Sequence, residues 1–188
     1  MSRILCLDLD GVLHPADCRV LLDFSAPGWQ LATQARTQGL LRWLPELEVA
    51  LAGSDAKILV HSTWRRRASD QAMRELLGPE LGPRVISTDR WISPQERESL
   101  SHAAYIDLAL NTWQEVEGVQ VESVCVLDDR PSMFQEDAHM LTSWHPQFIW
   151  TNPALGVSDV TATREALSQW TSAPVMGWQA APPEAPQA

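Results

Sequence analysis

Positive charge is scarce in this 188-residue sequence. Its 14 lysine and arginine residues face 24 aspartate and glutamate residues, which gives a formal net charge of −10. Proteins that coat DNA or RNA rely on a broad positive field, and this chain lacks one. We therefore expect no extended nucleic-acid binding, whereas a local basic patch would suffice for a single phosphorylated end.

Long apolar runs and paired cysteines are missing as well. No apolar run approaches the roughly 20 residues that span a bilayer. The first run is broken by Asp8 and Asp10 and is too short for the core of a signal peptide. The three cysteines have neither the spacing of a zinc knuckle nor that of a CxxC pair. These absences predict a soluble, cytoplasmic protein with reduced thiols and no membrane partner.

The chain has the length of one domain with a full hydrophobic core. Its composition, with 45% hydrophobic and 20% charged residues, is that of a globular protein. Proline and alanine dominate the last residues, so we assign 1–171 to the domain and 172–188 to a flexible tail. The oligomeric state has no signature in the sequence.

Short apolar runs alternate with helical patterns along the domain. The expected strands cover residues 4–10, 57–61, 84–87, 119–127 and 148–151. The expected helices cover residues 30–37, 45–53, 65–77, 94–113 and 158–170, with the arginines of 65–77 facing outward. This alternation predicts an α/β fold with three layers, in which helices cover both faces of a Rossmann-like parallel sheet.

Acidic and hydroxyl side chains stand where three of the expected strands end. They are Asp8 and Asp10, Ser62, and the pair Asp128 and Asp129. Open parallel sheets bind ligands at the carboxyl ends of their strands, so these groups should converge. Four carboxylates in one place repel each other unless they share a cation, and Mg²⁺ prefers oxygen ligands. We therefore predict a Mg²⁺ site on the four aspartates.

The two aspartates of the first strand suit phosphoryl transfer. Alternate residues of an extended chain point the same way, which directs Asp8 and Asp10 toward one site. One carboxylate can then attack a phosphoryl group while the other protonates the leaving oxygen. Gly11 follows, and its lack of a side chain permits a tight turn close to a bound phosphate.

Three segments resemble motifs of the haloacid dehalogenase-like (HAD) hydrolase superfamily. Residues 8–13 (Asp-Leu-Asp-Gly-Val-Leu), 58–65 (Ile-Leu-Val-His-Ser-Thr-Trp-Arg) and 124–130 (Val-Cys-Val-Leu-Asp-Asp-Arg) resemble its first, second and fourth motifs in order and spacing. The resemblance spans residues 3–170. It is greatest to the small domains with minimal or no cap, including those of bacterial RNA-repair proteins, where a Gly-hydrophobic-Ser/Thr segment, here 156–158, recurs.

This resemblance assigns roles to the residues at the strand ends. It implies that Asp8 is the nucleophile and a metal ligand, and that Asp10 is the acid/base and offers its backbone carbonyl to the metal. Ser62 would hydrogen-bond the phosphoryl group. Asp129 would bind Mg²⁺ directly, and Asp128 would support it or serve as an alternate ligand.

The third motif of the superfamily, usually a lysine, is not matched. The single lysine, Lys57, begins the second strand and so lies at the wrong end of the sheet. The role of steadying the phosphoryl charge then falls to Arg97 or His102, and the spacing of His102 from Tyr105 and the following isoleucine favours His102.

Three further residues are expected to contact substrate. Gly11 and Thr63 follow the catalytic positions directly, and Arg65 begins the only basic cluster, Arg65 to Arg67. An arginine at this edge can bind a phosphate, although such a cluster is more often the solvated start of a helix. His61, next to Ser62, is expected to pack in the core.

Together these features predict a Mg²⁺-dependent phosphomonoester hydrolase that acts through an aspartyl-phosphate at Asp8. The expected substrate is a phosphorylated small molecule such as a nucleotide, or the terminal phosphate of a nucleic acid. Two alternatives stay open: a catalytically silent HAD-like binding or regulatory module, and a phosphotransferase that uses the same residues. Residues 14–39 are the only candidate for a small cap.

Overall fold

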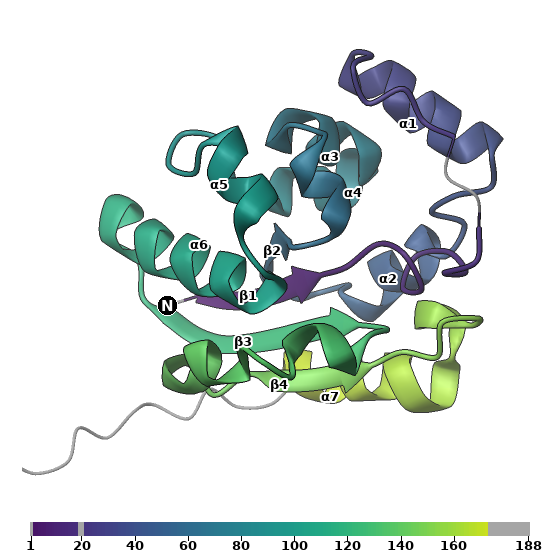
Figure 1. Ribbon diagram of the computed structural model, residues 1–188. Helices are drawn as coiled ribbons and strands as arrows, with labels where there is room; N and C mark the ends of the chain where they lie inside the picture. The colour runs from purple at the N-terminus through teal and green to yellow at the C-terminus, as the bar shows by residue number, and fades with distance from the viewer. Residues whose placement is uncertain (1, 19–20, 173–188) are drawn as a thin grey trace, which may run out of the picture.

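A four-stranded parallel sheet forms the centre of the protein (Figure 1). The computed structural model describes residues 2–18 and 21–172. The strands are β1 (Ser2–Leu7), β2 (Lys57–Val60), β3 (Val121–Asp128) and β4 (Gln147–Trp150), in the order β2-β1-β3-β4. All neighbouring strands run parallel, so their carboxyl ends share one edge. The predicted Rossmann-like α/β fold is confirmed.

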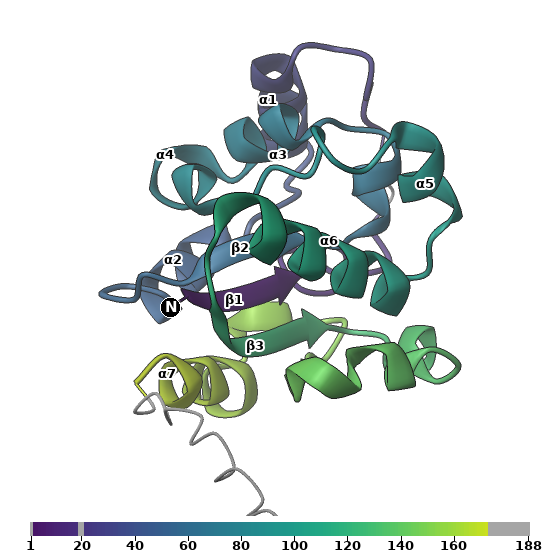
Figure 2. The ribbon, with the colours of Figure 1, turned by 90° about the vertical axis from the view of Figure 1, so that its left-hand side faces the viewer.

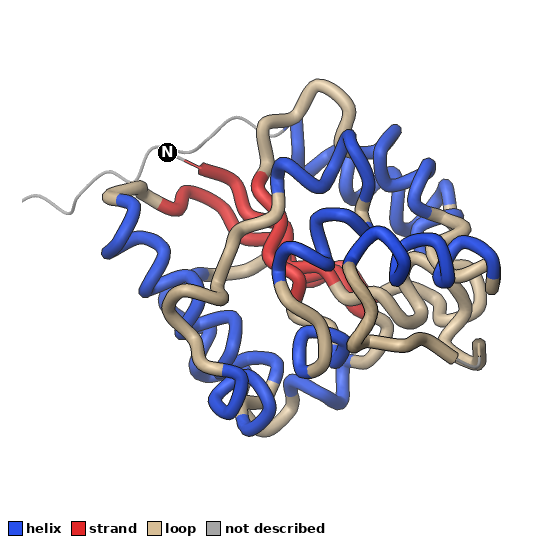
Figure 3. Tube along the Cα trace, turned by 90° about the horizontal axis from the view of Figure 1, so that it is seen from above, coloured by secondary structure: helices blue, strands red, loops and turns tan. Residues whose placement is uncertain are grey.

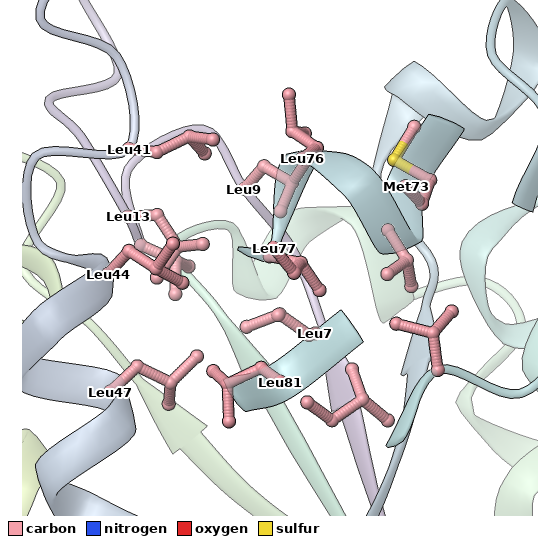
Figure 4. Packing of buried hydrophobic residues seen from close by; sticks show 14 of the residues in the cluster. Leu7, Leu9, Leu13, Leu41, Leu44, Leu47, Met73, Leu76, Leu77 and Leu81 are labelled. Atoms are coloured by element: carbon pink, nitrogen blue, oxygen red, sulfur yellow. The ribbon is translucent and has the colours of Figure 1, made fainter. Parts of the chain in front are cut away.

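Each face of the sheet is covered by its own hydrophobic core. Because side chains alternate along a strand, Leu5 and Leu7 of β1 enter one core while Ile4 and Cys6 enter the other. The first core is completed by α1 (Gly28–Thr37), α2 (Leu44–Ala50), α3 (Asp70–Leu76), α4 (Gly78–Leu81) and α7 (Glu165–Ser172). Figure 4 shows the leucines of this core packed around Leu7.

The second core lies under α6 (His102–Glu117) and the short 3-10 helices Pro131–Phe134 and Ala138–Trp144. Figures 1 and 2 show α6 and α7 on opposite sides of β3. Seen from above, helices lie on both sides of the strands (Figure 3). The expected three-layer arrangement is therefore present.

Two predicted helices are each divided in the structure. The helix expected over 65–77 is a 3-10 turn, Thr63–Arg66, followed by α3, which Ser69 caps by accepting a hydrogen bond from the Ala72 N–H. The helix expected over 94–113 is α5 (Pro94–Ser99) and then α6. Ser93 and Ser101 each cap a helix of their own, and a capping serine ends the preceding helix by turning the chain.

The prediction of a strand over 84–87 is wrong. Only Val85 forms a bridge to the sheet, through Ile58, and the described residues contain four strands instead of five. The last predicted helix is α7, preceded by a π-helical turn, Val160–Arg164. It runs to Ser172, and residues 173–188 of the predicted tail lie outside the described part of the chain. Within residues 2–18 and 21–172, none of the helices combines the length and apolarity that a membrane crossing requires.

Gly156 offers a test of how the loop after β4 is held. Its φ of +51° is left-handed, and a Cβ there would overlap the carbonyl oxygen of Val12 and the indole of Trp43. We expect Gly156→Ala to lower the free energy of unfolding by about 3 kcal/mol, because backbone strain and overpacking add. Urea denaturation of the full chain measures this loss.

Gly39 is the matched control. Its φ is +70°, but a Cβ at this position meets no atom within 4 Å. Gly39→Ala should therefore cost only the backbone strain, about 1 kcal/mol. Equal losses in the two variants would contradict the close packing of Gly156.

Candidate active site

Three carboxylates meet at the carboxyl edge of the sheet. Asp8 follows β1, and Asp128 and Asp129 stand at the end of β3, the neighbour of β1. One carboxylate oxygen from each of the three lies within 4.8 Å of the other two. The backbone N–H of Asp8 donates to the Leu127 carbonyl at 3.0 Å, which fixes the two strand ends in register. Three of the four aspartates expected at the strand ends therefore converge.

The charges of these carboxylates are poorly compensated by protein groups. Burial and then the charge of Asp128 raise the pKa of Asp8 well above its usual range, although the Leu9 N–H and the Ser62 hydroxyl favour its ionised form. Burial also raises the pKa of Asp129, against the opposing charge of Arg130. Among the described residues, Asp128 Oδ2 and Asp129 Oδ1 are buried without a hydrogen-bond partner, although Arg130 Nε lies 3.5 Å from Asp129 Oδ1. Converging carboxylates are the kind of oxygen ligands that a hard divalent cation such as Mg²⁺ prefers.

Asp10 lies beside this cluster on its open side. The indole N–H of Trp64 donates to Asp10 Oδ2 at 3.1 Å, and His14 Nε2 lies 3.0 Å from Asp10 Oδ1. Both oxygens of the carboxylate are thereby held in place. Asp10 also lines a pocket of about 420 Å³ together with Thr63 and Trp64. A molecule in this pocket would reach the Asp10 carboxylate directly.

Ser62 and Gly11 bring the backbone close to the cluster. Ser62 is fully buried after β2, where its hydroxyl accepts a hydrogen bond from the Trp64 N–H and lowers the pKa of Asp8. Gly11 has a φ of +70°, and a Cβ there would overlap the carboxylate of Asp129. Thr151 donates its hydroxyl proton to the Gly11 carbonyl at 2.9 Å and so secures the turn. The turn after β1 has no room for any residue other than glycine.

Arg65 corrects the expectation that the arginines of this segment face outward. Its side chain is buried, and backbone carbonyls satisfy its donors. Nη1 donates to the carbonyls of His61 and Ser62, and Nη2 donates to the carbonyl of Leu100. Its guanidinium also stacks over the Tyr105 ring, 4.4 Å from the centroid. These bonds tie the end of β2 to the start of α6. A contact of Arg65 with substrate stays a prediction, and the exposed cations beside Asp10 are Arg66 and Arg67.

The family model of the HAD domain in Swiss Army Knife RNA repair proteins matches residues 4–162. The chain belongs to this HAD family. The resemblance inferred from the three motifs is thereby confirmed. No curated protein and no solved structure shows a significant match to the chain.

The two candidates for the third motif of this HAD domain differ in their contacts. Arg97 is ion-paired with Asp89. His102, the first residue of α6, points its Nδ1 toward Asp128 and lies 3.6 Å from Oδ2. The structure thus places His102, and not Arg97, in contact with a member of the acidic cluster.

His61 belongs to the same contact, which the sequence did not reveal. It is fully buried, as expected, but its Nδ1 lies 3.8 Å from Asp128 Oδ2 and 3.4 Å from His102 Nδ1. Burial lowers the pKa of His61 to about 3, against the attraction of Asp128, so the imidazole is neutral at pH 7. Burial opposes ionisation of Asp128 too, yet its pKa falls because His102 and the Arg130 N–H favour the carboxylate.

His14 was also not identified as part of the site of this HAD domain. Its only signal in the sequence is a position four residues after Asp10. The bridge between Asp10 and His14 exists because the turn at Gly11 folds the chain back on itself. The pattern of the residues alone does not specify that turn.

Tyr105, under the Arg65 guanidinium, provides a test of this packing. Burial, followed by the charge of Asp70, raises the pKa of Tyr105 to about 12, although a hydrogen bond with Thr88 partly opposes the shift. It is the single tyrosine of the chain, so the change in absorbance on phenolate formation comes from one residue. We expect a midpoint near 12 in the folded protein and near the ordinary value of about 10 in urea.

The same shift predicts the alkaline stability of the HAD domain. The folded state keeps the phenolic proton that the unfolded state loses, so the contribution of Tyr105 is complete below about pH 10 and is lost as the pH rises toward about 12. Phenolate formation near pH 10 in a protein that circular dichroism shows to be folded would contradict the buried position of Tyr105.

Proposed function

We propose that this HAD domain is a Mg²⁺-dependent phosphomonoester hydrolase that acts through an aspartyl-phosphate on Asp8. The observation that carries the proposal is the convergence of the Asp8, Asp128 and Asp129 carboxylates, with ligand atoms within 4.8 Å of one another, beside an oriented Asp10. The free thiols of its three cysteines suit the reducing cytoplasm in which we expect it to act.

Two displacements at phosphorus complete the reaction. An Asp8 oxygen attacks the phosphorus, the bond to the leaving oxygen breaks, and Asp10 gives that oxygen a proton. Asp10 then takes a proton from water, whose oxygen attacks the phosphorus of the acyl phosphate. The bond between phosphorus and Asp8 breaks, which releases inorganic phosphate and restores both carboxyl groups.

The remaining residues would bind the cation and position the phosphoryl group during these steps. Asp8, Asp128 and Asp129, with the Asp10 carbonyl, would hold Mg²⁺, which when bound supplies positive charge against the carboxylates and the phosphoryl oxygens. Ser62 can donate its hydroxyl proton to a phosphoryl oxygen. Gly11 leaves space for the Asp129 carboxylate, which a side chain at this turn would displace. His102 is the proposed counterpart of the third-motif lysine.

The pocket at Asp10 favours a nucleotide or a nucleic-acid terminal phosphate as substrate. Its wall carries Arg66 and Arg67, and the Arg67 guanidinium lies 4.3 Å from the centroid of the Phe24 ring. Phe24 meets Trp64 edge-on at 5.6 Å. Arginines bind phosphates and aromatic rings stack with bases, so the pocket suits both parts of a nucleotide. The occurrence of the family in RNA repair proteins supports the nucleic-acid end.

One feature favours a catalytically silent binding module instead. The superfamily lysine is replaced by His102, so a permanent positive charge is missing from the third motif. A phosphotransferase would share all the residues above and differ only in the acceptor. Release of phosphate to water separates the hydrolase from both alternatives.

Asp8→Asn is the direct test of the proposed nucleophile. Phosphate release should fall by about three orders of magnitude or more, because the attacking oxygen is removed. Its melting temperature should equal or exceed that of the wild type, since burial and Asp128 disfavour the charge of Asp8. Release is measured with and without Mg²⁺ on nucleotides, sugar phosphates and oligonucleotides phosphorylated at either end.

The matched control is Asp17→Asn, a change of the same chemistry at an exposed aspartate, which should leave release unchanged. Phosphate release near the wild-type rate from Asp8→Asn would contradict the proposed mechanism. If the wild type releases no phosphate from any substrate but still binds Mg²⁺, the silent module replaces the hydrolase.

Trp64→Phe tests the orientation of the proposed acid/base. The change keeps an aromatic ring, though a smaller one, in the buried position and removes the indole N–H that donates to Asp10 Oδ2. We expect kcat to fall roughly tenfold or more, because proton transfer depends on the placement of Asp10. Trp29→Phe, at an exposed tryptophan, is the control. An unchanged kcat would show that the Trp64 bond has no part in the reaction.

A further inference from the structure

A second group of potential metal ligands adjoins the acidic cluster. His61 follows β2, His102 begins α6 and Asp128 ends β3, so three separate elements supply one side chain each. The two Nδ1 atoms are 3.4 Å apart, and they lie 3.8 and 3.6 Å from Asp128 Oδ2. All three side chains are buried. The three atoms thus form a nearly equilateral triangle in the interior.

Hydrogen bonding accounts for only one edge of this triangle, the contact between the two Nδ1 atoms. Both separations from Asp128 Oδ2 exceed the length of an N–H···O hydrogen bond, and this oxygen has no hydrogen-bond partner among the described residues. The other oxygen, Oδ1, accepts from the Arg130 N–H at 2.7 Å, which directs Oδ2 to the histidines. A buried carboxylate oxygen without a partner is costly, and a bound cation would satisfy it.

The size of the triangle matches a transition-metal ion. A point at equal distance from three atoms with these separations lies about 2.1 Å from each of them. Zinc in proteins binds imidazole nitrogen at roughly 2.0–2.1 Å and carboxylate oxygen at roughly 2.0–2.2 Å. Imidazole is a poor ligand for Mg²⁺ and a good one for zinc and its neighbours.

We propose that His61, His102 and Asp128 form a second metal site, which takes a divalent transition ion such as Zn²⁺. The site differs from the proposed Mg²⁺ site, which is formed by Asp8, Asp128 and Asp129. Asp128 is the one residue that belongs to both sites. Phe134 closes it on one side, since both imidazole rings meet the Phe134 ring edge-on at 5.9 Å. This packing holds the two rings in the orientation in which both Nδ1 atoms face the carboxylate.

The ion also explains how the site manages without the third-motif lysine. An ion on His61, His102 and Asp128 places a permanent positive charge beside the acidic cluster, which a neutral histidine does not. Only this consequence rests on the proposed hydrolase. Binding of the ion follows from the three side chains alone.

Zinc content tests the site without any assay of activity. The full chain is stripped with a chelator, dialysed against Zn²⁺ in the presence of excess Mg²⁺, and analysed by mass spectrometry of the metal. We expect about one zinc ion per chain in the wild type and less than about a tenth of that in His102→Arg and His61→Gln. Cobalt in place of zinc should give the visible absorption of a low-coordinate site in the wild type and lose it in His102→Arg.

Two control variants locate the ion. His139→Ala removes an exposed histidine and should keep the zinc. Asp8→Asn should also keep it while phosphate release is lost, so failure of the metal site and failure of the proposed hydrolase give different results. Equal zinc in the wild type and His102→Arg, or loss of zinc in Asp8→Asn or His139→Ala, overturns the proposal.

X-ray absorption on the zinc-loaded wild type needs no variant and decides the matter even if the substituted proteins fail to fold. Two imidazole ligands are expected in the spectrum. A spectrum without imidazole scattering overturns the site.

Discussion

Mutual repulsion of buried carboxylates is the constraint on which the rest of this site depends. Parallel strands deliver Asp8, Asp128 and Asp129 to one edge of the sheet, where burial raises the pKa of Asp8 and Asp129. The fold could avoid this cost only by keeping the strand ends apart, and the backbone hydrogen bond from Asp8 to Leu127 prevents that. Compensation must therefore come from what surrounds the cluster, and a cation is the group that can satisfy several carboxylates at once.

The neighbours of the cluster are arranged to tolerate this charge. Gly11 provides a turn in which no side chain competes for space with Asp129. Arg65 is a buried cation that interacts electrostatically with Asp8. Its Nη donors, however, are hydrogen-bonded to backbone carbonyls. Arg65 therefore stabilises the site by joining the end of β2 to the start of α6. Arg66 and Arg67 instead line the pocket at Asp10. Arg65 is thus buried with the core, whereas Arg66 and Arg67 are exposed at the same edge of the sheet.

Much of this arrangement was predictable from local patterns. The apolar runs that end in Asp8, Ser62 and Asp128 identified β1, β2 and β3, because buried parallel strands read as continuous apolar segments. The capping serines were less visible, since Ser69 and Ser101 interrupt stretches whose helical periodicity continues on both sides. The expected strand over 84–87 had a suitable composition, but only Val85 reaches the sheet. Burial of Arg65 had no signal, because an arginine at a helix start is ordinarily solvated.

The sequence by itself determined the fold, the family and the acidic residues at the strand ends, since each is encoded in a short contiguous segment. Tertiary structure alone decided which groups surround those acids. His61, His102 and Asp128 are far apart in the chain and meet only because β2, β3 and α6 pack into one core, in which Phe134 contacts both imidazole rings. In the same way, Asp10 is oriented by Trp64 from the end of another strand. Contacts between distant segments depend on the packing of whole elements, to within a few tenths of an ångström, and no local pattern of residues carries that information.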